Sequence, residues 1–292
     1  MIVVTTPTGA IGRQVVGHLL DAQAPVRVVA RDPDRLSPQV RERAEVVPGS
    51  HGDADVTDRA FAGADAVFWL VPPNPRAESV DAAYSGFSRP ACQAFARHGV
   101  QRVVGISALG RGTPVVAHSG FVAATLALDD LIAGTGVSYR ALTMPSFMDN
   151  LLRQTGSIKD GVFFQPISGD HKSPACANRD IADVAARLLL DDSWSGVDSV
   201  PVLGPEDLSF DEMAQIMSEV LGWPVRFQQV PVEAFRARLL TAGMSEAMAQ
   251  GMADMAVAKE NGLDDAEPRT PAASSPTTFR QWCTEVLRPR FS

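Results

Sequence analysis

The stretch that decides the fold is Val4-Thr5-Thr6-Pro7-Thr8-Gly9-Ala10-Ile11-Gly12-Arg13, which joins a short apolar run to a segment of helical period. The run before it is β-branched and predicts a strand, and the segment after it places its apolar residues on one helical stripe. Glycines at such a turn let the backbone approach a phosphate, and the free N–H groups of a helix N-terminus complete an anion site. The stretch therefore predicts a loop that binds the pyrophosphate of a dinucleotide.

Apolar strand-like runs alternate with helical segments through the first half of the chain. This rhythm predicts an α/β fold of the Rossmann type, a doubly wound parallel sheet with helices on both faces. The expected strands are Ile2–Thr5, Val26–Ala30, Glu45–Val47, Ala66–Val71, Arg102–Ile106 and Ser138–Leu142, and the expected helices are Ile11–Leu20, Ala77–His98 and Phe121–Ala133.

The rhythm loosens after about residue 145. We expect an NAD(P)-binding Rossmann domain over residues 1–150 and a smaller mixed α/β substrate or lid region over 151–292, with part of the sheet returning near 180–205. In that region we expect a strand at Phe163–Ile167, helices at Ile181–Leu190, Phe210–Leu221, Met244–Lys259 and Phe279–Leu287, and an extended strap at Glu267–Thr278.

Four methionines of the expected helix Met244–Lys259, namely Met244, Met248, Met252 and Met255, share one helix face. This pattern is typical of a flexible core or lid face, and a groove for an apolar ligand is the alternative.

The charge of the chain narrows the classes of partner. There are 26 basic and 34 acidic residues, a net charge of −8, which argues against nucleic acid and membrane surfaces as partners. The three cysteines have no metal-ligand spacing and are expected to be reduced packing residues. The N-terminus shows neither a signal sequence nor a membrane span, so we expect a cytoplasmic protein. A homodimer is compatible with the sequence.

The cofactor choice depends on the end of the second expected strand, where Arg31-Asp32 follows Val26–Ala30. An arginine there accommodates the 2′-phosphate of NADP, whereas an acid binds the 2′-hydroxyl of NAD. Because Arg31 comes first, we expect NADP. Asp32 keeps NAD as the alternative, and both residues could instead cap the next turn.

Several motifs in order resemble one family. They are Thr8-Gly9-Ala10-Ile11-Gly12, then Arg27-Val28-Val29-Ala30-Arg31-Asp32-Pro33, Arg102-Val103-Val104-Gly105-Ile106-Ser107-Ala108, Gly136-Val137-Ser138-Tyr139 running on to Asn150, and Arg179-Asp180-Ile181-Ala182-Asp183. Over residues 1–235 the chain resembles the NmrA-like branch of the atypical short-chain dehydrogenase/reductases.

That resemblance implies an NAD(P)-binding Rossmann domain and a small C-terminal domain that closes over the nicotinamide. The resemblance also implies that enzymatic members of the family often act on quinones or other carbonyl compounds, whereas some other members are redox sensors. It assigns cofactor contacts to Gly9, Ala10, Ile11, Gly12, Arg31, Val71, Pro72, Pro73, Ser107 and Ala108, and we expect Thr6 and Thr8 of the same loop as further cofactor contacts. It assigns the pocket floor to Pro145, Phe147 and Met148.

The chain departs from the family in two places. Thr6 stands where the family has the first glycine of its loop, so either the loop shifts or the Thr6 hydroxyl contacts the phosphates. Gly49-Ser50 stands where the family often has an acid after the third strand, with Asp53 as a displaced substitute, so no adenine contact is assigned there.

The catalytic Tyr-x-x-x-Lys of classical short-chain reductases is missing, because Tyr84 and Tyr139 are followed four positions later by Ser88 and Thr143. We predict His118, together with Ser107 beside the nicotinamide, as the catalytic candidates; a surface or helix-capping role is the alternative for His118. A quinone tolerates the missing acid, because its reduced form is an aromatic phenolate that takes its proton from water.

The expected substrate is therefore a quinone or a polycyclic aromatic ketone. Stacking against it is predicted for Trp69 and Phe163, with Phe147 and Phe164 nearby and His118 at its carbonyl, although each aromatic residue could belong to the core. Two other functions stay open. One is oxygenation of an aromatic polyketide, a tailoring monooxygenase without flavin or metal; the other is a non-catalytic NAD(P)-binding redox sensor.

Overall fold

The computed structural model describes residues 1–291. A seven-stranded sheet forms its centre, and every strand pairs with its neighbours in parallel. The sheet order is β10 (Val197–Pro201), β6 (Ser138–Met144), β5 (Arg102–Ala108), β4 (Ala66–Trp69), β1 (Ile2–Thr5), β2 (Val26–Ala30) and β3 (Glu45–Pro48). The doubly wound Rossmann fold is confirmed.

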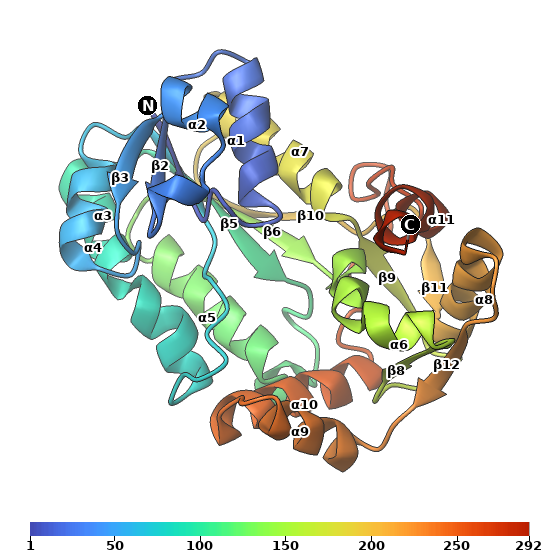
Figure 1. Ribbon diagram of the computed structural model, residues 1–292. Coiled ribbons are helices and arrows are strands. Elements are labelled where there is room, and N and C mark those ends of the chain that lie inside the picture. The colour runs from blue at the N-terminus through green and yellow to red at the C-terminus, as the bar shows by residue number, and fades with distance from the viewer. Residues whose placement is uncertain (292) are drawn as a thin grey trace.

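Helices cover both faces of this sheet because its strands are apolar on both sides (Figure 1). In β4, Phe68 packs towards α1 (Gly12–Asp21) and α7 (Asn178–Leu190), whereas Val67 and Trp69 pack towards α3 (Ala54–Phe61), α4 (Phe87–His98) and α5 (Phe121–Ala133). The short helix α2 (Pro38–Arg43) lies between β2 and β3 in the chain.

The sheet order reverses between β1 and β4, and this reversal positions the site. From that point β1, β2 and β3 follow one another towards one edge of the sheet, and β4, β5 and β6 follow one another towards the other edge. A crevice opens outside the carboxyl ends of the strands at such a switch point, and ligands of open α/β sheets bind there. The Thr5 hydroxyl joins the two strands, since it donates to the Phe68 carbonyl over 2.9 Å and accepts from the Leu70 amide over 3.1 Å.

The rest of the chain forms a smaller layer around two short sheets. One has the order β11 (Asp207–Ser209), β9 (Lys172–Cys176) and β7 (Ser146–Phe147); the other pairs β12 (Arg226–Gln229) with β8 (Val162–Gln165). The helices of this layer are α6 (Thr155–Lys159), α8 (Phe210–Leu221), α9 (Val232–Thr241), α10 (Glu246–Glu260) and α11 (Phe279–Trp282). Helices α6, α8 and α11 share a core with the two short sheets, which contains Met148, Phe163, Met217 and Trp282.

Helix α10 lies between the two layers, beside α5 and α9 (Figure 1). Met248 packs with Ala77 and Ala83 of the Rossmann layer, and Met255 packs against the cluster around Leu126 of α5. At its other end, Glu260 accepts a 2.7 Å hydrogen bond from the Ser168 amide of the smaller layer. The methionine face is therefore core in part, and the helix ties the two layers together.

Several elements differ from the expectations. The predicted helix Ala77–His98 begins later, as a π-helical turn over Ala82–Gly86 that leads into α4. Helix α3 and strands β9, β11 and β12 were not predicted, because short elements carry little periodicity of their own. Cys92, Cys176 and Cys283 are buried and free. Within residues 1–291, no helix has the length and apolar character needed to cross a membrane.

Candidate functional site

The phosphate loop presents unpaired amides at the carboxyl end of β1. The backbone N–H groups of Ala10, Ile11 and Gly12 have no hydrogen-bond acceptor within the described residues. The N-cap of α1 offers no capping side chain, and its first turn contains no acidic residue. Free amides together with an uncapped helix dipole favour an anion at this position.

Gly12 has to be a glycine because the backbone of Thr6 lies against it. A Cβ atom on Gly12 would come within 2.2 Å of the Thr6 carbonyl oxygen, far inside van der Waals contact. The loop therefore closes tightly enough to bring its amides around a small anion.

Thr6 stands at the position where the family has the first glycine of its loop, and both its backbone and its hydroxyl suit that position. Its φ is 52°, in the left-handed region that favours glycine, so the loop retains this conformation at Thr6 itself. Its Oγ1 is buried without a hydrogen-bond partner in the described chain. A buried hydroxyl without a partner costs free energy, and a phosphate oxygen would satisfy it. These residues fit a dinucleotide pyrophosphate.

The loop after β2 distinguishes between its two candidate residues. The Asp32 carboxylate accepts a 3.2 Å hydrogen bond from the Asp34 amide and caps the 3-10 turn Pro33–Arg35. Arg31 is exposed, and its guanidinium makes no ion pair or hydrogen bond within residues 1–291. The arrangement leaves Arg31 free for a 2′-phosphate, while Asp32 is already engaged in the turn.

A buried histidine, His51, supports the far side of the crevice. Its Nε2 lies 3.0 Å from the Leu70 carbonyl, just before the segment Val71-Pro72-Pro73 that was predicted to contact the second ribose. The ring packs edge-on against Trp69 and Phe87, with centroids 5.1 and 5.0 Å away. Burial, and secondarily the charge of Arg31, lowers the pKa of His51 to about 4, so the ring is neutral near pH 7.

Ser107 belongs to a buried polar cluster that the sequence did not reveal. Its hydroxyl donates to Asp129 of α5, and the hydroxyl of Tyr139 donates to the other oxygen of that carboxylate over 2.6 Å. Burial raises the pKa of Asp129 to about 6, although both hydrogen bonds oppose this shift. Burial and the neighbouring Asp129 raise the pKa of Tyr139 well above its usual value.

The two tyrosines cannot act as the acid of a classical short-chain reductase. Tyr139 is 1% exposed and is bonded to Asp129, and burial raises the pKa of Tyr84 as well. Among the lysines, Lys259 is paired with Asp264. His118 is exposed in a 3-10 turn ahead of α5, where solvent reaches it.

Three predicted substrate contacts were wrong, because their side chains are in the core. Trp69 is 1% exposed and donates to the Ser88 hydroxyl over 3.2 Å. Phe163 is completely buried against Phe210 and Phe227, and Met148 is 3% exposed in the same C-terminal core.

Two other predicted pocket residues, Pro145 and Phe147, lie directly after β6. Pro145 is buried directly after that strand, and Phe147 is half-buried in β7. Phe164 is half-buried under Arg238, whose guanidinium carbon lies 4.3 Å from the ring centroid. Ala108 is half-buried beside the Leu126 cluster. Phe147 therefore remains the predicted aromatic contact at the carboxyl end of the sheet.

Comparisons with known proteins agree with this geometry. Residues 7–192 match the family described as NAD(P)H-binding. The chain is 34% identical over 243 residues, 82% of this chain and 80% of the relative, to a (4-alkanoyl-5-oxo-2,5-dihydrofuran-3-yl)methyl phosphate reductase from Streptomyces griseus. It is 27% identical over 256 residues, 87% of this chain and 86% of the relative, to an NAD(P)H azoreductase from Xenophilus azovorans.

A solved structure shows the same fold. The NADPH-dependent quinone oxidoreductase from Escherichia coli, in complex with NADPH, aligns with a TM-score of 0.79 over 98% of this chain and 99% of that one, at 21% identity.

The chain therefore belongs to the NAD(P)H-binding family of Rossmann-fold proteins, which confirms the resemblance to the NmrA-like, atypical short-chain dehydrogenase/reductases. It is an oxidoreductase of that family with NAD(P)H as its cofactor.

Proposed function

We propose that this protein transfers a hydride from NADPH to a quinone or a polycyclic aromatic ketone. The observation that carries the proposal is the state of the two tyrosines. Tyr139 is bonded to a buried carboxylate, and burial raises the pKa of the half-buried Tyr84, so neither hydroxyl readily delivers a proton. The acceptor must then be one whose reduced form takes its proton from water.

Bound NADPH supplies the hydride, and the chemistry of the acceptor decides what else the protein must supply. A simple ketone becomes a strongly basic alkoxide, so its reduction depends on a positioned acid. A quinone becomes an aromatic phenolate that is stable at neutral pH and collects a proton from solvent. Orientation over the nicotinamide then provides most of the rate enhancement. The names of the relatives, an azoreductase and a quinone oxidoreductase among them, support an electron-accepting substrate of this kind.

The residues of this chain have separate roles in the proposal. The amides around Gly12 and the hydroxyl of Thr6 hold the pyrophosphate, and Arg31 holds the 2′-phosphate of NADPH. Ser107 and Ala108 lie beside the nicotinamide, and Phe147 offers its half-buried ring to the flat acceptor. His118, which solvent reaches, orients the acceptor carbonyl.

The test offers purified full-length protein NADPH or NADH with menadione, an anthraquinone and cyclohexanone, under air and under nitrogen. Absorbance of the reduced nicotinamide and product mass are followed. We expect consumption of NADPH with the two quinones and none with cyclohexanone. Equal rates with cyclohexanone would overturn the quinone assignment. Cofactor binding without consumption would indicate a redox sensor, and a product heavier by one oxygen would indicate the tailoring monooxygenase.

The role of His118 needs its own variant. If water supplies the proton, His118→Gln lowers kcat with menadione by less than about threefold, because the glutamine amide still donates a hydrogen bond to the carbonyl. A loss of about a hundredfold or more would instead assign general acid catalysis to this histidine. Binding of NADPH, followed by fluorescence, serves as the control for folding.

A further inference from the structure

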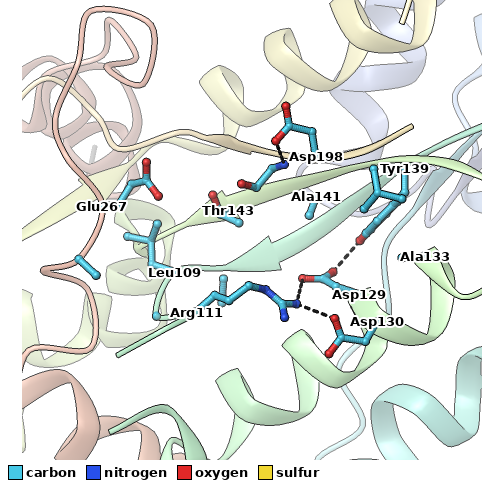
Figure 2. A pocket seen from close by; sticks show the side chains of 15 residues that line it. Leu109, Arg111, Asp129, Asp130, Ala133, Tyr139, Ala141, Thr143, Asp198 and Glu267 are labelled. Carbon is cyan, nitrogen blue, oxygen red and sulfur yellow. Dashed lines mark hydrogen bonds and ion pairs between the residues drawn. The ribbon is translucent and has the colours of Figure 1, made fainter. Parts of the chain in front are cut away.

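A pocket of about 410 Å³ opens on the α5 side of the sheet and has no assigned ligand (Figure 2). Its walls come from β6, β10, α5, the loop after β5 and the strap after α10, and include Leu109, Ala133 and Ala141 as apolar surface. Of the residues predicted to hold the cofactor, only Ala108 reaches it. Its volume is that of a small-molecule site.

Acidic side chains dominate the charge of this pocket. Asp129, Asp130, Asp198 and Glu267 line it, against the single cation of Arg111. The Arg111 guanidinium lies 3.0 Å from Asp130 and 3.9 Å from Asp129, so it neutralises one carboxylate and part of a second. The remaining excess of negative charge disfavours an anionic ligand and favours a cation.

Asp129 is the deepest of these acids, with 7% of its side chain exposed. Each carboxylate oxygen accepts one hydrogen bond, from Tyr139 on one side and Ser107 on the other. A carboxylate offers about four acceptor positions, so each oxygen retains one for a further donor. The two hydroxyls also fix the orientation of the carboxylate, which makes it a preformed anchor.

Thr143 provides an independent indication of a ligand. It is 8% exposed in β6 and lines the same pocket, and its Oγ1 has no hydrogen-bond partner within residues 1–291. Figure 2 shows its hydroxyl among the residues around the pocket, together with Asp129 and Arg111. An unpaired buried hydroxyl calls for a polar group from outside the protein.

We propose that this pocket binds a small organic cation, in which an ammonium group donates to Asp129 and a neighbouring polar atom pairs with Thr143. The apolar walls from Leu109, Ala133 and Ala141 enclose the hydrocarbon part of the ligand. The site is separate from the phosphate loop, and its ligand binds whether or not NADPH is present.

The experiment measures binding to full-length protein by calorimetry, with and without saturating NADPH. The probes are benzylammonium and phenethylammonium, with benzyl alcohol and benzoate as the neutral and anionic counterparts of the first. We expect the ammonium probes to bind one per chain, at least about tenfold more tightly than the alcohol or benzoate, and with the same affinity when NADPH is bound.

Two variants locate the site. Asp129→Asn should weaken the binding of benzylammonium by at least about tenfold. A third probe, phenethylammonium with a β-hydroxyl group, tests the contact to Thr143: Thr143→Val should weaken the binding of this probe more than the binding of phenethylammonium itself. Asp160→Asn, a carboxylate of the smaller layer outside the pocket, is the matched control and should change nothing. Far-UV circular dichroism checks that each variant is folded.

The proposal fails if benzyl alcohol binds as well as benzylammonium, if NADPH displaces the probe, or if Thr143→Val and Asp129→Asn both leave the affinities unchanged. It also fails if no ammonium probe binds at millimolar concentration. None of these results bears on hydride transfer, so failure here and failure of the reductase proposal are distinguishable.

Discussion

The carbonyl oxygen of Thr6 lies 2.2 Å from the position that a Cβ atom on Gly12 would occupy. Backbone on one side and the start of α1 on the other leave no flexible side chain that could move away. The contact therefore ties the shape of the phosphate loop to the absence of a single methyl group.

Gly12→Ala is expected to displace the loop and to weaken NADPH binding by at least about a hundredfold, since the displaced amides no longer converge on the pyrophosphate. The measurement is calorimetric titration with NADPH. Gly17→Ala is the matched control in the same helix, because a Cβ there meets nothing within 4 Å. It should leave affinity unchanged and stabilise the protein by about 1 kcal/mol. Equal affinities for the two variants would contradict the role of the loop.

Thr6 combines a strained backbone with an unpaired hydroxyl, and two variants separate these properties. Thr6→Gly should raise the free energy of unfolding without NADPH by about 1 kcal/mol, because glycine adopts this φ at little cost. Thr6→Val retains the branched shape but loses the hydroxyl, so NADPH binding should fall by about five- to tenfold. Unfolding in urea and NADPH titration measure the two effects. A Thr6→Val variant with unchanged affinity would show that the hydroxyl does not contact the phosphates.

Arg31→Ala should weaken the binding of NADPH by about tenfold or more and the binding of NADH by less than about twofold, because only NADPH carries the 2′-phosphate. The readout is the ratio of the two dissociation constants. Arg288→Ala removes one exposed positive charge at the other end of the chain and controls for net charge. If both arginine variants shift the ratio alike, the effect is one of overall charge.

His51 and Asp129 should give opposite pH dependences of stability. The pKa of His51 is about 4 in the folded chain against 6.5 ordinarily, so its stabilisation is complete above pH 6.5 and is lost as the pH falls towards 4. The pKa of Asp129 is raised from 3.8 to about 6, so its contribution is complete below pH 3.8 and declines as the pH rises towards 6.

Between about pH 4 and 6 each of these groups contributes a slope of up to about 1.4 kcal/mol per pH unit, with opposite sign. Relative to the unaltered protein, His51→Phe should lose stability as the pH rises through this window, and Asp129→Asn should gain it. Urea unfolding at several pH values measures both. Parallel profiles for the two variants would show that one of the shifts is absent.

The phosphate loop and the parallel sheet were predictable because their signals are local. Residues 4–13 contain a strand end, two glycines and a helix start in sequence, and each has a direct backbone consequence. The sequence favoured Arg31 over Asp32 as the contact to the adenosine ribose, but it could not show that the Asp32 carboxylate is engaged by the next turn.

The aromatic residues were not predictable in the same way, because composition does not distinguish a pocket wall from a core. Trp69 follows Val67 on the same face of β4 and is buried with it under α4, and Phe163 is buried beside Phe210 from a distant helix. The cluster around Asp129 was not predictable for a similar reason, because it depends on contacts between segments that are distant in the sequence. Its partners Ser107 and Tyr139 are 22 and 10 residues away, and only the alignment of β5 and β6 under α5 brings them together.

Strand β10, at one edge of the large sheet, comes late in the chain, and this affects the order in which the sheet can be completed during synthesis. Its residues follow the segment that builds β7, β8 and β9, so a ribosome releases this strand only after the smaller layer has begun to emerge. A fragment that stops at residue 150 leaves the outer edge of β6 open and lacks α7, whose apolar side covers α1. The cofactor-binding half is thus completed by later residues, and a fragment ending at residue 150 lacks part of its sheet and of its core.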